Sequence, residues 1–114
     1  MKEIQAFIRP KKLNEVYNAL RVEGFCCLTV FEGEGTGKYT DANKDWPSLQ
    51  HPFMHSKVAK LEMVCQDENV EKVAEIIHQY GSTGHSGDGL IYISDVEEVI
   101  RIRDGKKGLK TLHH

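Results

Sequence analysis

The chain has 114 residues, a formal net charge of −2 at pH 7 and 28% charged residues. This length suits one domain with a modest core, and the acidic balance argues against a broad basic surface for nucleic acid. No apolar run reaches the roughly 18 residues of a membrane span, and the first residues lack the apolar core of a signal peptide. We therefore expect one cytoplasmic domain over residues 1–112, with neither nucleic-acid binding nor membrane insertion. Residues 113–114 are interpreted as a tag remnant.

The first part of the chain predicts three regular elements. Apolar and polar residues alternate over residues 2–9, which is typical of a half-buried strand, and Pro10 ends the pattern. Apolar residues at helical spacing predict a helix over residues 11–22, with Gly24 placed where a left-handed cap is needed. The apolar, β-rich run over residues 25–31 predicts a second strand.

A long segment without periodicity follows, over residues 35–56. At about twenty residues it is too long for an ordinary connection in so small a domain, and such loops usually carry a function or are disordered. Its apolar side chains, Trp46, Leu49, Phe53 and Met54, are costly to leave in water. We therefore predict that this loop orders against a partner, a ligand or a neighbouring subunit.

The rest of the chain repeats the same succession of elements. Alternation predicts a strand over residues 57–66, and Asp67 or Asn69 is placed to cap the helix that follows. A strand over residues 90–94 and a short helix over residues 95–99 are expected next. The order predicts an α+β, ferredoxin-like βαββαβ fold, in which an antiparallel sheet carries its helices on one face. Because two helices cannot hide all the apolar residues, we expect the other face to be buried against other subunits.

The glycine-rich stretch of residues 81–89 separates the second helix from the last strand. Glycine costs little at positive φ and lets the backbone approach a ligand closely, so successive N–H groups can converge on phosphate oxygens. The stretch predicts an anion-binding loop. A long turn that binds nothing is the alternative, because glycine-rich turns without a ligand are common.

Four stretches, in the same order, resemble the PII signal-transduction family over nearly the whole chain. They are residues 2–10, 12–16, 83–89 and 99–105. The resemblance implies a homotrimer with three clefts between subunits, each binding an adenine nucleotide, ATP or ADP. It also implies a T-loop at about residues 36–56 that contacts a partner protein, a B-loop at about 82–90 and a C-loop at about 101–108.

The resemblance also implies which residues hold the nucleotide. Backbone N–H groups and guanidinium groups are suited to polyphosphate, which agrees with the residue types at the matching positions. These positions are Thr29, Gly35, Gly37, Lys38, Val64, Gly84, Gly87, Asp88, Gly89, Arg101 and Arg103.

Several positions depart from the family pattern. Leu90 replaces a phosphate-binding lysine, so we expect weaker binding or a preference for fewer phosphates. Tyr39 replaces a glutamine that ligates magnesium and helps to hold 2-oxoglutarate, and Val58 replaces a lysine near that site. Magnesium is therefore left open, and 2-oxoglutarate sensing is not expected. His51 stands where some members have a uridylylated tyrosine, so that covalent switch should be absent.

The partner protein and two alternative functions, metal binding and catalysis, can also be considered from the residue types. The T-loop is similar to that of a divergent subgroup associated with heavy-metal efflux, which makes a membrane transporter the candidate partner. His51, Met54 and His55 also permit a CutA-like trimeric metal-binding protein, since His and Met suit Cu(I) or Zn(II). Against it, Cys26 and Cys27 should point to opposite faces of a strand, and the odd total of three cysteines suits reduced thiols. An enzyme is not expected, because Asp88 has neither a Walker-type lysine nor a paired carboxylate beside it.

Overall fold

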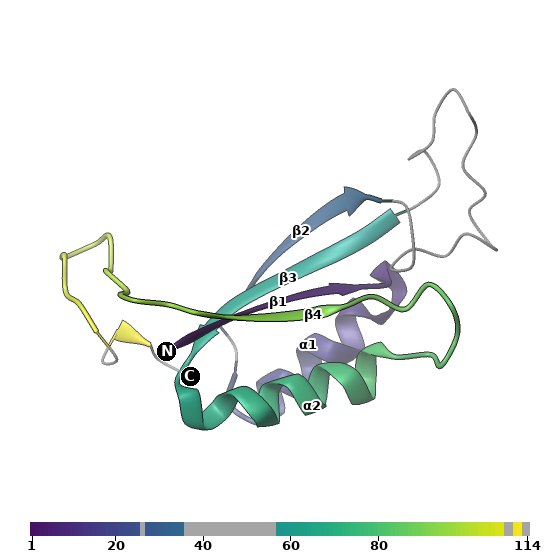
Figure 1. Ribbon diagram of the computed structural model, residues 1–114, viewed down its shortest axis with the longest axis horizontal. Helices are drawn as coiled ribbons and strands as arrows, with labels where there is room; N and C mark the ends of the chain where they lie inside the picture. The colour runs from purple at the N-terminus through teal and green to yellow at the C-terminus, as the bar shows by residue number, and fades with distance from the viewer. Residues whose placement is uncertain (26, 36–56, 109–110, 113–114) are drawn as a thin grey trace.

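The computed structural model describes residues 1–25, 27–35, 57–108 and 111–112, and its fold is a four-stranded sheet with two helices on one face (Figure 1). The strands are β1 (Lys2–Ile8), β2 (Thr29–Glu34), β3 (Lys57–Cys65) and β4 (Ile91–Asp95), in the spatial order β2-β3-β1-β4. All three neighbouring pairs are antiparallel. The helices are α1 (Leu13–Val22) and α2 (Val70–Gly81), each preceded by a 3-10 turn, Pro10–Lys12 and Asp67–Asn69. This confirms the predicted ferredoxin-like fold.

The core lies between the sheet and the helices. Alternate residues of the two central strands point into it, and each helix adds an apolar stripe at helical spacing. The side chains with almost no exposure are Ile4, Val16, Leu20, Leu61, Cys65, Val73 and Ile77. Gly81, the last residue of α2, packs so closely that a Cβ there would lie 3.4 Å from Ile8 Cγ2 and Val16 Cγ2.

The opposite face of the sheet carries aromatic side chains. Phe7 and Tyr92 meet edge to face with ring centroids 5.6 Å apart, and the Lys60 ammonium lies 5.8 Å from the ring centroid of Phe31. Phe31 remains 52% exposed and Tyr92 48% exposed. Rings of this size are costly to leave in water, so this face retains apolar surface that a partner could cover.

The second strand begins later than predicted. Gly24 adopts positive φ (91°) at the end of α1, as expected of a left-handed cap. The next residue, Phe25, is buried, and its N–H donates to the Leu20 carbonyl at 2.9 Å. Phe25 therefore closes the end of the helix instead of joining the sheet, and pairing with β3 starts only at Thr29. The prediction of a strand from Phe25 was wrong at its first residues because helix capping determined their backbone.

The predicted short helix over residues 95–99 is not formed. Asp95, its expected cap, is the last residue of β4 and forms an ion pair with Lys2. The chain then continues beside the amino terminus, where the Val96 N–H donates to the Met1 carbonyl at 3.1 Å. Pairing with β1 has thus extended the strand through the position where a helix was expected to begin.

The predicted side-chain cap of α2 was also wrong. Asn69 occupies the cap position, but its side chain makes no capping hydrogen bond. Asp67 instead accepts a hydrogen bond from the amino-terminal ammonium group at 2.8 Å. Within the described ranges, no helix is long and apolar enough to cross a bilayer.

Candidate functional site

The glycine-rich loop connects α2 to β4 and lies at one end of the sheet (Figure 1). Gly84 and Gly87 adopt positive φ of 79° and 101°, which favours glycine. Gly89 is required for a different reason, because a Cβ there would lie only 1.6 Å from the Phe7 carbonyl oxygen. The Phe7 N–H donates to the Leu90 carbonyl at 2.9 Å, so the chain runs beside β1 as soon as it leaves the loop.

The Asp88 carboxylate organises the inside of this loop. One oxygen accepts hydrogen bonds from the backbone N–H groups of Thr83 at 2.8 Å and Gly84 at 2.9 Å. The other accepts from the Thr83 hydroxyl at 2.7 Å and from Arg9 Nε at 2.9 Å. The Asp88 side chain closes the loop upon itself, and its contact with a nucleotide stays a prediction.

Arg9 was not predicted as a site residue, although it is central to the loop. Its side chain is only 10% exposed, and its second donor, Nη2, lies 2.9 Å from the Ser86 carbonyl oxygen. Sequence reasoning used Arg9 only as the last residue of a strand. One feature of the sequence could have indicated this role. Arg9 stands directly before Pro10, at the end of the first strand, and a βαββαβ topology brings that strand end next to the glycine loop.

The charge of Asp88 is fixed by these contacts. Partial burial raises the pKa of its carboxyl, but hydrogen bonds from Thr83, Arg9 and the Gly84 backbone outweigh burial and hold the pKa well below its usual value. Asp88 is therefore ionised at neutral pH and balances the charge of Arg9. The pair contributes no net positive charge to an anion-binding site.

Two backbone donors of the loop make no hydrogen bond among the described residues, although Gly87 is buried and, of these two glycines, only Gly89 lines the adjoining cavity. The Asp88 N–H donates to the His85 carbonyl at 3.3 Å, so it is already used. Within the described ranges, the N–H groups of Gly87 and Gly89 donate no hydrogen bond. Two glycine donors flanking Asp88 fit the predicted contact with phosphate oxygens better than Asp88 itself does.

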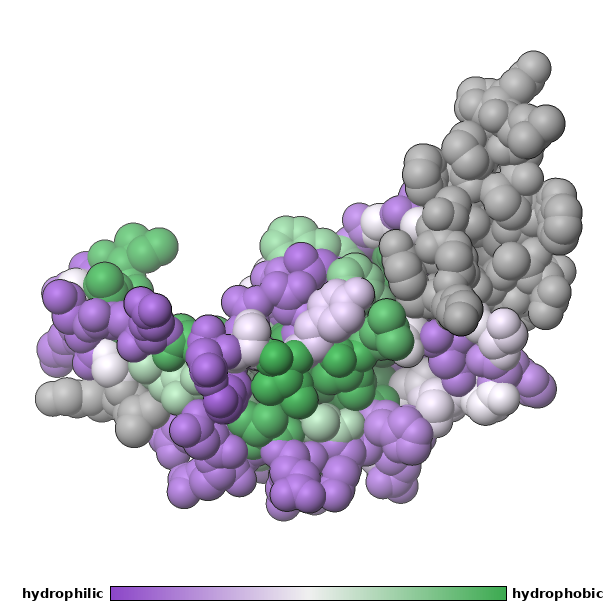
Figure 2. Space-filling view, in the orientation of Figure 1, coloured by the Kyte–Doolittle hydropathy of each residue, from purple (hydrophilic) through white to green (hydrophobic). Residues whose placement is uncertain are grey.

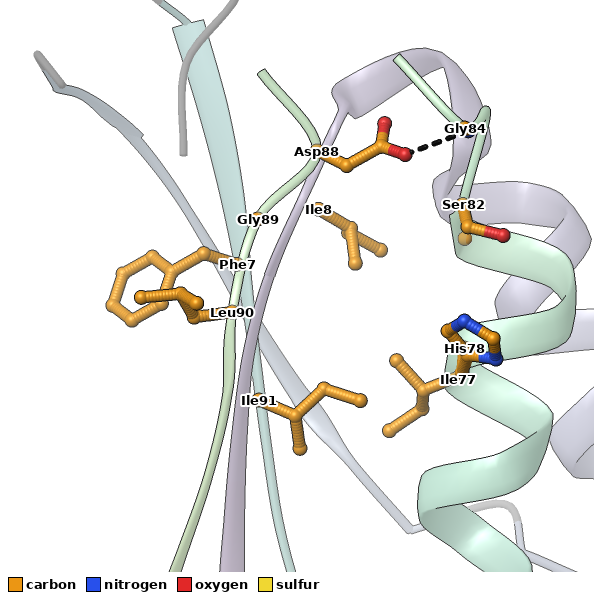
Figure 3. A pocket seen from close by; sticks show the side chains of 11 residues that line it. Phe7, Ile8, Ile77, His78, Ser82, Gly84, Asp88, Gly89, Leu90 and Ile91 are labelled. Atoms are coloured by element: carbon orange, nitrogen blue, oxygen red, sulfur yellow. Dashed lines mark hydrogen bonds between the residues drawn. The ribbon is translucent and has the colours of Figure 1, made fainter. Parts of the chain in front are cut away.

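A cavity of about 280 Å³ adjoins the loop between α2 and β4. Figure 3 shows Ile8, Ile77 and Ile91 pointing into it, with Asp88 and Gly84 at one end. The residues lining the cavity include no lysine or arginine. A polyphosphate bound at this end would therefore need positive charge from another part of the protein.

The two predicted arginines lie at the other end of the molecule (Figure 1). Here the chain turns back after β4, and Ile100 pairs with Lys107 in an isolated antiparallel bridge. Arg101 Nη2 lies 3.0 Å from Asp104 Oδ2, and Arg103 is exposed. Thr29 is exposed at the first position of β2, and Val64 pairs with Glu3 near the start of β1, towards this same end of the sheet.

The structure thus divides the predicted site residues into two groups. Gly35 follows the end of β2 at the glycine-loop end, where Glu34 pairs with Lys57. The first group comprises Gly35, Gly84, Gly87, Asp88 and Gly89, and the second comprises Thr29, Val64, Arg101 and Arg103. One copy of the chain does not bring the two groups together. Gly37 and Lys38, which the resemblance places with Gly35 at the base of the T-loop, lie outside the described residues.

The residues of the metal-binding alternative, His51, Met54 and His55, also lie outside the described ranges, as does Cys26. Within those ranges, no three His, Cys, Asp or Glu side chains cluster as metal ligands. Cys27 is exposed and Cys65 is buried, and neither forms a disulfide bond within the described residues. Burial raises the pKa of the Cys65 thiol, which keeps it protonated as a small apolar core residue.

The fold and the loop define a small ferredoxin-like α+β domain that presents glycine N–H donors at one end and arginines at the other. Residues 1–106 match the family model described as nitrogen regulatory protein P-II. The chain belongs to this family, whose members are signal-transduction regulators and not enzymes.

Similar proteins cover almost the full chain. Nitrogen regulatory protein P-II 2 of Methanothermobacter thermautotrophicus is 42% identical over 112 residues, which span 98% of this chain and 97% of that protein. Nitrogen regulatory protein P-II of Rhizobium meliloti is 41% identical over 112 residues, or 98% of this chain and 100% of that protein. The protein of the same name from Azospirillum brasilense is 40% identical over 108 residues, covering 95% and 96%.

Proposed function

We propose that the chain acts in the cytoplasm as a homotrimeric regulator that binds ATP or ADP in clefts between subunits. Nucleotide occupancy would set the conformation that residues 36–56 present to a partner protein, and a membrane transporter is the candidate partner. The observation that carries the proposal is the division of the predicted site between opposite ends of one chain. Glycine donors at one end, where the charge of Arg9 is balanced by Asp88, complement the arginines at the other.

Head-to-tail association would unite the two groups. In such an arrangement the glycine loop of one copy faces Thr29, Val64, Arg101 and Arg103 of the next, and every copy uses both of its ends. If the copies form a closed ring, the glycine loop of every copy faces the arginines of a neighbour. Guanidinium groups and backbone N–H groups are together well suited to phosphate oxygens.

The exposed apolar surface supports association. Figure 2 shows a hydrophobic patch, coloured green, over the side of the molecule where β4 and α2 face the viewer. Leu90 and Ile93 are each 49% exposed, and Ile102 on the C-terminal turn is fully exposed. Large side chains left in water on a small domain are typical of surfaces that contact another protein.

Mixed trimers give a direct test. Arg101→Ala removes the charge from one end, and Gly87→Val blocks the donors at the other. Titration calorimetry should detect no ATP or ADP binding to either variant alone. If the two ends belong to different subunits, co-expressed variants should recover about a quarter of the clefts, because one subunit supplies an intact loop and its neighbour an intact arginine.

The controls separate loss of the site from loss of the fold. Native mass spectrometry should show trimers for both variants and for the mixture, with circular dichroism unchanged. Absence of nucleotide binding by the unaltered protein, with stoichiometric retention of copper or zinc, would overturn the proposal in favour of the metal-binding alternative. Recovery of no binding in mixed trimers, while the unaltered protein binds, would show that both residues act within one subunit.

A further inference from the structure

The turn after β4 holds Arg101 in one orientation. The Arg101 N–H donates to the Lys106 carbonyl at 2.8 Å, and the Gly105 N–H donates to the Arg101 carbonyl at 2.8 Å. Gly105 adopts positive φ (71°), which allows so tight a return. The backbone on both sides of residues 102–104 is therefore fixed by hydrogen bonds.

Asp104 sits within this turn and binds the guanidinium group of Arg101 with both oxygens. Arg101 Nε donates to Oδ1 at 3.1 Å and Nη2 donates to Oδ2 at 3.0 Å. The Lys106 N–H also donates to Oδ1 at 3.1 Å. The hydrogen bond from Arg101, followed by that from the Lys106 backbone, lowers the pKa of Asp104, so its carboxyl is ionised at neutral pH.

This contact occupies one of the two-donor edges of Arg101. A guanidinium group binds a phosphate best through two parallel N–H groups, and a bidentate carboxylate competes for the same geometry. A phosphate that approaches Arg101 must use its remaining donors or displace Asp104. In either case it meets a fixed negative charge beside the arginine.

We propose that Asp104 is a specificity-determining residue that lowers the affinity for each additional phosphate charge and so favours AMP and ADP over ATP. The inference rests on the proposed function, because Arg101 must face a nucleotide bound at a neighbouring glycine loop. It goes further by assigning the selection among nucleotides to a side chain that does not itself bind phosphate.

The other charges near the two ends agree with this assignment. Arg9 is neutralised by Asp88, and Leu90 carries no charge at the exit of the glycine loop. Among the described residues, Arg103, Lys106 and Lys107 of the same turn make no ion pair, so Asp104 compensates only one of the four cations there. With Arg101 paired to Asp104, this turn carries less net positive charge and gains less from a triphosphate than a turn in which Arg101 is unpaired.

The test compares Asp104→Asn with the unaltered full-length chain. Asn keeps a carbonyl oxygen that can accept hydrogen bonds from Arg101 and the Lys106 N–H but removes the negative charge. Titration calorimetry with AMP, ADP and ATP, at fixed ionic strength and without magnesium, should show ATP affinity rising about tenfold and AMP affinity about twofold, with ADP between them. Asp104→Ser provides a second variant without the charge.

A charge-matched control is Glu75→Gln on the exposed side of α2, which removes one carboxylate from a helix outside the C-terminal turn. It should change all three affinities by the same small factor. If both Asp104 variants change AMP, ADP and ATP affinity equally, or weaken ATP most, the inference is wrong and nucleotide binding itself still stands. If the unaltered chain binds none of the three nucleotides, the proposed function fails and this inference fails with it.

Discussion

The two ends of the molecule use the same pair of residue types in different ways. At the glycine-loop end, Arg9 and Asp88 are 79 positions apart in sequence, and their side chains are 10% and 23% exposed. At the other end, Arg101 and Asp104 are three positions apart, with exposures of 25% and 29%. The first pair joins distant parts of the fold, whereas the second shapes a single turn.

The two pairs differ mainly in their arginines, since Arg9 is more shielded than Arg101 whereas the two carboxylates are similarly exposed. Removing one partner of a shielded pair leaves the other charge without adequate solvation, which is strongly destabilising. Removing one partner of an exposed local pair changes stability little, because water solvates the charge that remains. We therefore expect changes at the glycine loop to affect folding and changes at the C-terminal turn to affect binding.

The largest expected effect is at Gly89. Gly89→Ala would place a Cβ 1.6 Å from the Phe7 carbonyl oxygen, and neither backbone can move without disturbing β1. We expect a loss of about 3 kcal/mol or more in the free energy of unfolding, measured by urea denaturation. Gly33→Ala in β2 is the matched control, since its nearest neighbour is the Val58 side chain at 3.9 Å. Equal stability of the two variants would contradict the close contact.

Asp88→Asn should have the next largest effect. The new amide keeps one oxygen but presents N–H donors to groups that already donate, and it leaves Arg9 shielded without a carboxylate. We expect a loss of about 2 to 3 kcal/mol in the free energy of unfolding. Asp104→Asn should leave the urea midpoint unchanged. A similar loss for both variants would remove the distinction between the two ends.

The pH dependence of stability should isolate the Asp88 contribution. Its pKa is lower in the folded state than the ordinary value of 3.8, so the unfolded chain takes up a proton first as the pH falls. The stabilisation is therefore complete above that ordinary value and is lost on acidification. The stability difference between the unaltered chain and Asp88→Asn should shrink between about pH 5 and pH 3. A difference that stays constant over this range would contradict the assignment.

The smallest expected effect among the changes at the glycine loop is that of Thr83→Val. This change removes the hydroxyl that donates to Asp88 at 2.7 Å and accepts from the His85 N–H at 3.3 Å, while the side chain keeps its shape. The Thr83 backbone donor to Asp88 remains. We expect a loss of about 1 kcal/mol in the free energy of unfolding. A loss as large as that of Asp88→Asn would show that the hydroxyl, and not Arg9, is the main partner of the carboxylate.

Much of the fold could be predicted because periodicity reports local backbone conformation and burial. The strand at residues 2–8, both helices and the glycine loop follow from patterns of two or 3.6 residues and from glycine positions. The errors occurred where a distant partner determined the backbone. Asp95 has the residue type of a helix cap. Its conformation is instead set by strand pairing and an ion pair with Lys2, which is 93 positions away in the sequence.

The candidate site was predictable only in its residue types. A glycine-rich stretch can be recognised locally, and Gly84 and Gly87 do adopt the positive φ that only glycine adopts easily. The direction in which Asp88 points cannot be read from the local sequence alone, because it depends on Arg9, directly after β1, as well as on Thr83 and Gly84. The need for glycine at position 89 likewise depends on Phe7, which lies beside it only after the sheet has formed.

The contact between Gly89 and β1 also bears on how a ligand would be received. Because Asp88, Arg9 and the Phe7 backbone already hold the loop, its ordering entropy is lost during folding and not during association. A preorganised loop of this kind binds without a slow rearrangement of its own, and its affinity is not reduced by an ordering step. Conformational change on ligand binding should therefore be concentrated in segments other than the glycine loop.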